Sequence, residues 1–342
     1  MKKIILSTLL LFLLVALLAA CGESEEVNSS TAEDSAVEQL EAPERFLRIG
    51  SGPMGSGWYP ITTILSEVYM DNFSNLNVSQ LEGGSVSNLR AMEVGDIEMS
   101  MNFTSDFADA LNGSGTFEET LTKPTGIASL YPVYQTIATL ADNDSIESIE
   151  DIVDKHIFLG PQDGGGPVAF WRMMEEYGID EDVIKSSGGN ISYGNYSDGA
   201  SMLTDGNVDV IVAGGAPQVQ ALQEIELTRA VKVIPIDEDK LKSIEEKGYG
   251  ISYDNLPAGS YKGLDEEIPT YTTIAMLTIS SELPDSYVYD LTKLLWENMS
   301  IFEEQVPTRA VDFTLETVFD GVDPDTLHPG ARQYYEEIGA IE

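Results

Sequence analysis

The chain repeats one local pattern, in which a short apolar strand is followed by a turn rich in glycine and hydroxyl side chains and then by a helix. The strands of this pattern are expected at 46–49, 76–81, 97–103, 156–159 and 208–212. Strands that alternate with helices indicate parallel α/β sheets. Ligands of such open sheets bind at the carboxyl ends of the strands, where these turns lie. The pattern therefore predicts an α/β fold with a small-molecule site made of several turns.

The first unit shows the pattern most clearly. Its strand leads into a turn at 50–57, and a helix is expected over 58–73. The turn leaves the first N–H groups of that helix free, and free N–H groups at a helix start favour small anions such as carboxylates. Apolar residues of the helix recur at the spacing of one helix face: Ile61, Ile64, Leu65, Val68 and Tyr69.

The chain is long and strongly acidic. Its 342 residues suggest two domains, at roughly 150 residues per domain. Asp and Glu outnumber Lys and Arg by 58 to 18, and the formal net charge is -40. Such a charge repels nucleic acid and anionic membrane surfaces. Because 42% of the residues are hydrophobic, there is enough apolar material for one or two cores, and the acidity belongs to the surface of a folded protein.

Few residues are available for a metal or a redox centre. The single cysteine, Cys21, excludes a disulfide within the chain and a Cys-rich metal or iron–sulfur site. The two histidines, His156 and His328, are too few for a multi-histidine metal site, and both are expected to be structural. We therefore expect no metal and no cofactor.

The N-terminus resembles a bacterial lipoprotein export signal. Lys2 and Lys3 form a basic region, 4–18 is apolar, and Leu18-Ala19-Ala20-Cys21 is similar to a lipobox. Cleavage there removes residues 1–20 and leaves Cys21 as an N-terminus linked to diacylglycerol. Two alternatives stay open. One is an ordinary signal peptide with an incidental cysteine, and the other is an uncleaved membrane helix, although the run is shorter than the ~20 apolar residues that a span needs.

An acidic segment follows the export signal. Residues 22–44 carry eight acidic and no basic side chains, and little that a core would bury. We interpret 21–44 as a lipid-anchored, disordered tether. The tether would hold a folded body, which begins near Arg45, away from the membrane.

One enzyme motif has a literal match. Gly50-x-Gly52-x-x-Gly55 follows an expected strand and opens a helix, as the dinucleotide fingerprint does. However, Pro53 removes an N–H from the loop, and the next strand ends near Glu82, later than the ~20-residue spacing expected for the ribose-binding acid. The chain has no G-x-S-x-G elbow, Walker A loop or H-E-x-x-H motif. The sequence gives no positive indication of an enzyme.

Six segments, in the right order, resemble the TAXI family of solute-binding proteins, which serve TRAP transporters. They extend over nearly all of the chain from Arg45 onward and are more specific than any single glycine-rich loop. The segments are GSGPMGSGWYP (50–60), LEGGSVSNLRAMEVGDIEMSMNFTSD (81–106), SLYPVY (129–134), DGNVDVIVAGGAPQVQAL (205–222), VYDLTKLLWEN (288–298) and LHPGARQYYEE (327–337).

The resemblance implies a two-lobed α/β fold of the periplasmic-binding-protein (type II-like) kind, with a hinge between the lobes. Lobe one is expected at 45–134 plus 270–342 and lobe two at 135–269, with chain crossings near Tyr134 and Pro269. The lobes would close on one small organic anion and deliver it to a membrane permease driven by an ion gradient. A ligand stabilises the closed state only through contacts with both lobes.

The resemblance also assigns ligand-binding residues. Lobe one would contribute N–H groups and hydroxyls to carboxylate oxygens, with Asp106 suited to a ligand amine or to N-capping and Tyr131 placed to stack over the ligand. For each hydroxyl, a helix cap that faces no ligand is the alternative, and Trp58 and Tyr59 could instead pack in the core. The lobe-one residues are Ser51, Gly52, Ser56, Trp58, Tyr59, Gly84, Ser85, Asn88, Ser105, Asp106 and Tyr131.

Lobe two departs from the family pattern. Members usually have a Gly-Ser-Gly-Thr-like loop where this chain has Gly164-Gly165-Gly166-Pro167. Two hydroxyls and one N–H are missing where a carboxylate would dock, which weakens the transfer of glutamate-like specificity. No arginine stands out as a carboxylate clamp, since Arg90 and Arg172 are expected on helices as surface or lobe-packing residues. The lobe-two residues are Gly164, Gly165, Gly166, Pro167, Gly214, Gly215 and Pro217.

These features predict a lipid-anchored, extracytoplasmic and monomeric receptor for a small carboxylate, without enzyme activity. Glutamate, glutamine and dicarboxylates are the candidate ligands by resemblance to the family. The expected partners are the ligand, the TRAP permease subunits and, through the lipid anchor alone, the membrane; nucleic acid is not expected. Two alternatives stay open: an exported enzyme with an acidic cleft, and a sensor subunit that presents its ligand-bound form to a signalling partner.

Overall fold

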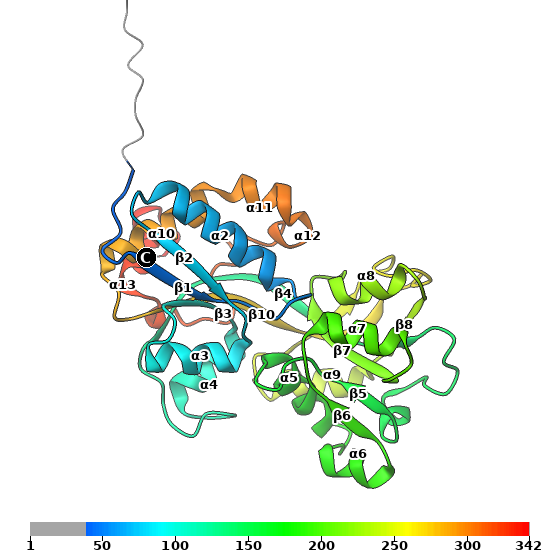
Figure 1. Ribbon diagram of the computed structural model, residues 1–342. Coiled ribbons are helices and arrows are strands. Elements are labelled where there is room, and N and C mark those ends of the chain that lie inside the picture. Colours follow the sequence, from blue (N-terminus) through cyan, green and yellow to red (C-terminus); the bar gives the residue numbers. More distant parts are fainter. Residues whose placement is uncertain (1–38, 342) are drawn as a thin grey trace, which may run out of the picture. The chain divides into compact units, whose positions relative to one another are not determined.

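The computed structural model describes residues 39–341, in which strands and helices alternate over most of the chain (Figure 1). The strands are β1 (Phe46–Gly50), β2 (Asn77–Leu81), β3 (Met99–Phe103), β4 (Pro124–Leu140), β5 (His156–Phe158), β6 (Asn190–Ser192), β7 (Val210–Gly215), β8 (Val231–Val233), β9 (Ser252–Leu256) and β10 (Ile268–Ser280). The α-helices are α2 (Trp58–Asn72), α3 (Ser85–Val94), α4 (Thr104–Asn112), α5 (Gly165–Glu175), α6 (Glu181–Ser187), α7 (Tyr196–Thr204), α8 (Gln220–Glu226), α9 (Glu238–Glu246), α10 (Asp285–Glu297), α11 (Met299–Gln305), α12 (Pro307–Ala310) and α13 (Pro329–Glu337), and two 3₁₀ turns lie at Ile149–Ile152 and Pro324–Thr326.

The sheet is mixed, with the strand order β2-β1-β3-β10-β4-β7-β5-β6. At one end β1 pairs in parallel with β2 and β3, and at the other end β5 pairs in parallel with β6 and β7. The two long strands between them, β4 and β10, are antiparallel to each other, with Tyr271 opposite Gln135 and Ser280 opposite Pro124. Two parallel units are therefore joined by one pair of continuous strands.

The buried apolar residues divide in the same way. One core draws its members from residues 42–133 and 275–335, and two further cores draw theirs from 137–271. The division falls within β4 and β10. We call β1 to β3 with α2 to α4 and α10 to α13 lobe one, and β5 to β9 with α5 to α9 lobe two. The two-lobed α/β fold expected from the sequence is confirmed, while the boundaries at Tyr134 and Pro269 stay predictions.

Local sequence explains how the lobe-one elements pack. The five periodic apolar residues expected on one face of α2 are all buried, and Figure 1 places α2 with α10 and α11 on one face of the lobe-one sheet and α3 with α4 on the other. In β3, where the sequence alternates apolar and polar residues, every residue is buried, because helices cover both faces of this central strand. Its polar side chains bond internally: Ser100 Oγ donates to Asn102 Oδ1 at 2.7 Å.

The folded body begins by residue 39, not at Arg45 as expected. Ala42 is buried in the lobe-one core, and the Asn75 amide accepts from its N–H at 2.8 Å and donates to its carbonyl at 2.9 Å. Since both backbone groups of Ala42 are satisfied, the last residues assigned to the tether pack as part of the body. The expected export signal, Cys21 and the rest of the tether lie outside the described residues. Within 39–341, no helix has the length and apolar character needed to cross a membrane.

Candidate functional site

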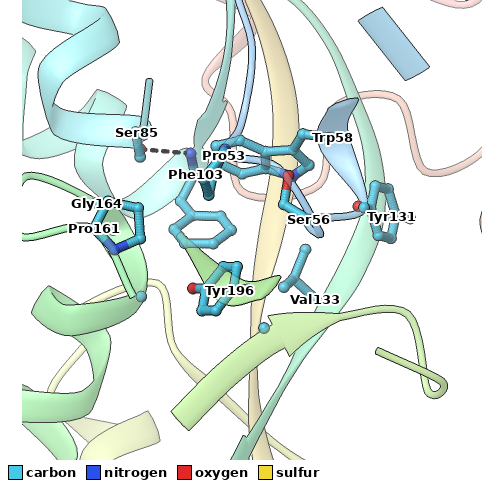
Figure 2. A pocket seen from close by; sticks show the side chains of 15 residues that line it. Pro53, Ser56, Trp58, Ser85, Phe103, Tyr131, Val133, Pro161, Gly164 and Tyr196 are labelled. Atoms are coloured by element: carbon cyan, nitrogen blue, oxygen red, sulfur yellow. Dashed lines mark hydrogen bonds between the residues drawn. The ribbon is translucent and has the colours of Figure 1, made fainter. Parts of the chain in front are cut away.

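A cavity lies between the two lobes, at the ends of strands and the starts of helices (Figure 2). Lobe one contributes the loop after β1, the start of α3 and the end of β3; lobe two contributes the loop after β5, the start of α7 and the end of β7, and β4 forms the back. The cavity volume is about 30 Å³. The lining residues are Pro53, Ser56, Gly57, Trp58, Gly84, Ser85, Phe103, Tyr131, Val133, Pro161, Gly164, Gly165, Gly166, Tyr196 and Gly214.

Three of the helices that begin at this cavity have a glycine as the N-cap. Gly57 precedes α2, Gly84 precedes α3 and Gly164 precedes α5, so none of the three caps has a side chain to bond the first N–H groups. The first N–H groups of a helix have no partner within the helix and carry partial positive charge. The first residues of these helices, from both lobes, therefore line the same small space, and this arrangement suits an anion.

The glycines also allow close contact between the lobes. A Cβ atom on Gly84 would lie 2.8 Å from Gly164 Cα, which is closer than atoms of this kind approach. The contact continues in a hydrogen bond from Ser87 N to Asp163 O at 3.1 Å. The starts of α3 and α5 thus meet through backbone, without intervening side chains.

Aromatic and hydroxyl groups complete the walls. Trp58 meets Phe103 edge to face, with 4.9 Å between ring centres. Ser56 Oγ and the Tyr131 hydroxyl are buried and have no hydrogen-bond partner in residues 39–341, and in Figure 2 the Tyr131 hydroxyl points toward Ser56. Burial raises the pKa of Tyr131 to about 12, so its hydroxyl stays protonated as a donor. Buried polar groups normally have partners, and a ligand oxygen would supply one here.

Half of the residues expected from the sequence line the cavity. Tyr131 lines the cavity with its hydroxyl. Its ring packs against Phe313, with 5.8 Å between the ring centres, and is not free to stack over a ligand. Trp58 both lines the cavity and packs in the core, which combines the two interpretations weighed for it. The expected residues that line the cavity are Ser56, Trp58, Gly84, Ser85, Tyr131, Gly164, Gly165, Gly166 and Gly214.

Several expected lobe-one residues have structural partners. Ser51 is fully buried, and its Oγ bonds Thr62 Oγ1 at 2.7 Å. Asn88 Nδ2 donates to Ser51 O at 3.0 Å and to Met101 O at 2.9 Å, so it ties α3 to β1 and β3. Gly52 lies against Ser56, and Tyr59 faces outward on α2 with 37% of its surface exposed. The sequence could not distinguish these roles, because ligand donors and internal donors are the same residue types.

Ser105 and Asp106 lie behind the cavity wall. Ser105 contacts Gly250, and Asp106 Oδ2 lies where a side chain on Gly165 would be, without a hydrogen-bond partner among the described residues. Burial raises the pKa of Asp106 to about 6, and the nearby Ser85 hydroxyl and Arg172 charge oppose that rise. Asp106 therefore lies behind the start of α5 and does not line the cavity.

The remaining expected residues of lobe two lie next to the cavity lining. Pro167 is buried in the first turn of α5, beyond Gly166. Gly215 packs at the end of β7 against Val219, and Pro217 follows in the turn before α8. Each is a neighbour in sequence of a lining residue, so the expected segments are those of the cavity while the exact positions differ.

The sequence did not identify some lining residues. Pro53 was noted only as the residue that removes an N–H from the dinucleotide-like loop. Tyr196 enters from α7, a helix that carried no signal. Gly57, Phe103 and Pro161 lie in or beside the expected strands and turns, and Val133 lies in the family-like segment 129–134. Their proximity to the expected residues in the sequence was the signal that could have found them.

The arginines considered as clamps are engaged elsewhere. Arg172 pairs with Asp109 of α4, across the lobes, and lies over the Tyr249 ring. Arg90 donates to Thr116 O at 2.7 Å and lies over the Phe117 ring. The histidines have structural partners: His156 Nε2 lies 2.7 Å from Ser192 Oγ, and His328 Nδ1 accepts from Gly330 N at 3.1 Å at the start of α13.

Comparisons with known proteins give one family match and several fold-level similarities. Residues 49–339 match the NMT1-like family. A putative L-cystine ABC transporter from Listeria monocytogenes shares 12% identity over 79% of this chain and 98% of its own, with a TM-score of 0.48. A binding protein component of an ABC phosphonate transporter from Pseudomonas aeruginosa shares 10% identity over 78% and 79%, with a TM-score of 0.47. The substrate binding protein of an amino acid ABC transporter shares 10% identity over 77% and 99%, with a TM-score of 0.45.

Proposed function

The chain belongs to the NMT1-like family, and on this premise we propose that it is an extracytoplasmic receptor that binds a small organic anion between its lobes. The observation that carries the proposal is the meeting of three uncapped helix starts, from both lobes, at one cavity. Two buried hydroxyls without partners, Ser56 Oγ and the Tyr131 hydroxyl, support it. The lining has no Asp, Glu, His, Cys or Lys, so its serine and tyrosine hydroxyls have no general base beside them among the lining residues.

Ligand capture in this proposal is a hinge motion. The cavity volume of about 30 Å³ is far below the roughly 300–1,000 Å³ typical of small-molecule sites. A ligand therefore enters only after the lobes separate. The hinge of this motion lies in the continuous strands β4 and β10, which join the lobes. The lobes then close on the ligand, whose contacts with the starts of α2 and α3 on one side and α5 on the other stabilise the closed state.

The transport role is the finer part of the proposal. We propose that the protein is anchored through Cys21 and delivers its ligand to a TRAP-type permease. The support is the lipobox-like Leu18-Ala19-Ala20-Cys21 and the six TAXI-like segments of the sequence. Glutamate, glutamine and dicarboxylates are the first ligands to examine on the same grounds.

A thermal-shift screen tests the proposal. The protein would start at residue 22, so that residues 39–44 keep their contacts with the body, and high salt would screen its charge. The screen covers amino acids, dicarboxylates, keto acids, aromatic acids and the primary amides of these acids. A ligand at 100 times its Kd adds ~2.7 kcal/mol to the free energy of unfolding, which is readily measured.

The recovered ligand decides between classes of protein. We expect at least one small anion to stabilise the protein and to be recovered chemically unchanged. A ligand that is consumed would establish an enzyme instead, and the absence of any stabilising solute would contradict a small-molecule receptor. If only neutral solutes bind, the receptor function stands and the proposal that its ligand is an anion fails.

A further inference from the structure

An unpaired arginine lies next to the cavity. Arg309, on α12, is only 9% exposed, and its Nε has no hydrogen-bond partner in residues 39–341. No ion pair of the described residues includes it, whereas Arg48, Arg172 and Arg332 all pair with carboxylates. Burying a charge is costly unless it is paired. A buried guanidinium without a carboxylate is therefore expected to have its anion supplied from outside the chain.

Gly57 connects Arg309 to the cavity. A Cβ atom on Gly57 would lie 2.6 Å from Arg309 Nε, 3.0 Å from Arg309 Nη2 and 3.0 Å from the Tyr131 hydroxyl. The guanidinium and the hydroxyl thus meet in the space that a side chain at position 57 would fill. Gly57 lines the cavity and is also the N-cap of α2, so a full positive charge lies directly behind a helix start that already attracts anions.

The neighbouring acids do not neutralise this charge. Asp312 is the nearest acid in the sequence, and burial alone raises its pKa, with no arginine acting against the rise. Asp106 lies at the opposite wall, behind Gly165. By contrast, the charge of Arg309 does act on Tyr131, where it partly opposes the rise in pKa caused by burial. A neutral hydroxyl that faces the cavity therefore lies beside the guanidinium.

We propose that Arg309 supplies the positive charge that binds the carboxylate of the ligand, with the hydroxyls of Tyr131 and Ser56 donating hydrogen bonds to the same carboxylate. The inference rests on the proposed receptor function and specifies the chemical group bound at the lobe-one end of its site. All three residues are buried, and Arg309 Nε, the Tyr131 hydroxyl oxygen and Ser56 Oγ are buried atoms without a hydrogen-bond partner in residues 39–341. A guanidinium suits this task because its planar donors match the two oxygens of a carboxylate.

Calorimetric titration of variants tests the assignment. The probes are the carboxylic acids that stabilise the wild-type protein in the thermal screen, each beside its primary amide. We expect the acid to bind and the matched amide to bind far more weakly. Arg309→Met should weaken binding of the acid by about 30-fold or more, because the carboxylate would be buried without its charge partner. Arg309→Lys should retain part of the affinity, since it keeps the charge and loses the planar fork.

Arg332→Met is the matched control. It removes the same charge from α13, where Arg332 pairs with Asp325 and Glu336 at the surface, and it should leave binding unchanged. Binding of the acid to Arg309→Met within about twofold of wild type, or equal binding of acid and amide, would overturn the assignment while the receptor function stands. If the wild-type protein binds neither acids nor neutral solutes, the receptor function itself fails.

A second measurement needs no ligand. Because an unpaired buried charge destabilises the protein that carries it, the ligand-free Arg309→Met variant should melt at a higher temperature than wild type. An arginine with a purely structural role would give the reverse, a lower melting temperature on removal. That result would also overturn the assignment.

Discussion

Asp106 is a buried acid behind the wall of the candidate site, and its burial makes it sensitive to pH. Its pKa is raised from 3.8 to about 6, mainly by desolvation. The folded protein therefore holds this proton more tightly than the unfolded chain does. The contribution of this tightly held proton to the free energy of unfolding is fully present below pH 3.8 and is lost as the pH rises through about 6.

The variant Asp106→Asn should remove this dependence. Its side chain stays neutral, so its free energy of unfolding should rise relative to wild type between pH 4 and 7, by about 3 kcal/mol in total. Urea unfolding of both proteins across this pH range measures the difference. Asp71→Asn, at an exposed position of α2, is the control. Its free energy of unfolding should change with pH in the same way as that of wild type. Parallel curves for Asp106→Asn would mean that the carboxyl does not carry a raised pKa.

Single residues also explain where the sequence was ambiguous. Ser51, Ser56 and Ser85 are all hydroxyls in turns, yet Ser51 bonds Thr62 within lobe one whereas Ser56 is left without a partner at the cavity. Ser85 does both, since it lines the cavity and accepts from Phe103 N at 2.9 Å. Which role a hydroxyl takes depends on side chains that are distant in sequence, so residue type alone could not decide it.

Helix starts are the elements on which the site depends. The starts of α3 and α5 meet at Gly84 and Gly164, whose backbones approach so closely that a Cβ atom at 84 would lie 2.8 Å from Gly164 Cα. Lobe closure requires this approach, because each helix has to bring its free N–H groups to the same ligand.

The variant Gly84→Ala should hold the two helix starts apart. Its added methyl group would overpack the contact, and overpacking of this kind costs about 1–3 kcal/mol. We expect about tenfold weaker binding of the ligand found in the thermal screen, measured by calorimetry. Gly126→Ala places the same methyl group 3.2 Å from Leu327 Cδ2 in lobe one, away from the cavity, and should bind normally. Equal affinity for both variants would contradict the role given to this contact.

Part of the secondary structure follows from local sequence. The face of α2 that the apolar spacing predicted is buried as expected. The five strands expected from the sequence lie within a few residues of β1, β2, β3, β5 and β7, whereas β4, β6, β8, β9 and β10 were not predicted. All of Met99–Phe103 is buried, although apolar and polar residues alternate along this strand. Alternation indicates one polar face, but whether helices cover that face is decided by the neighbouring chain segments.

Lobe closure is a property of the whole folded body. Besides the backbone contacts, two ion pairs of the described residues join the lobes. Arg90 of α3 and Asp163 form an exposed pair at 4.0 Å, whereas Arg172 of α5 and Asp109 of α4 pair with side chains that are only 12% and 19% exposed. A hydrogen bond to a charged group at such a position contributes about 2 kcal/mol. Because the Arg172–Asp109 pair forms only when the lobes are together, this energy favours the closed arrangement.

The variant Asp109→Asn should shift the ligand-free protein toward an open arrangement. Spin labels on Val94→Cys and Leu227→Cys, which are 70% and 83% exposed on lobe one and lobe two, report the distance between the lobes. They can be attached selectively because the one natural cysteine, Cys21, is absent from a protein that starts at residue 22. We expect longer distances in Asp109→Asn and a return to wild-type distances on addition of ligand.

A matched control separates lobe closure from general charge effects. Lys185→Met breaks the exposed pair of Lys185 with Glu181, which lies within α6 of lobe two. It should leave the distance distribution unchanged. Unchanged distances in Asp109→Asn as well would mean that the ion pair does not govern closure.

Local patterns in the chain suffice for the α/β class, for five of the ten strands and for most of the turns that form the site, while the two-lobed arrangement was implied by the family resemblance. The spacing of apolar residues, the composition of the turns and the order of elements depend on residues close together in the chain, so they can be predicted without a structure. The lining of the cavity cannot be read in this way. Tyr196 reaches the site from α7, and Arg309 lies next to Gly57 although 252 positions separate them in the sequence (309 minus 57). These contacts arise only when β4 and β10 join the two lobes and the lobes close, because burial and the absence of a partner are properties of the packed structure.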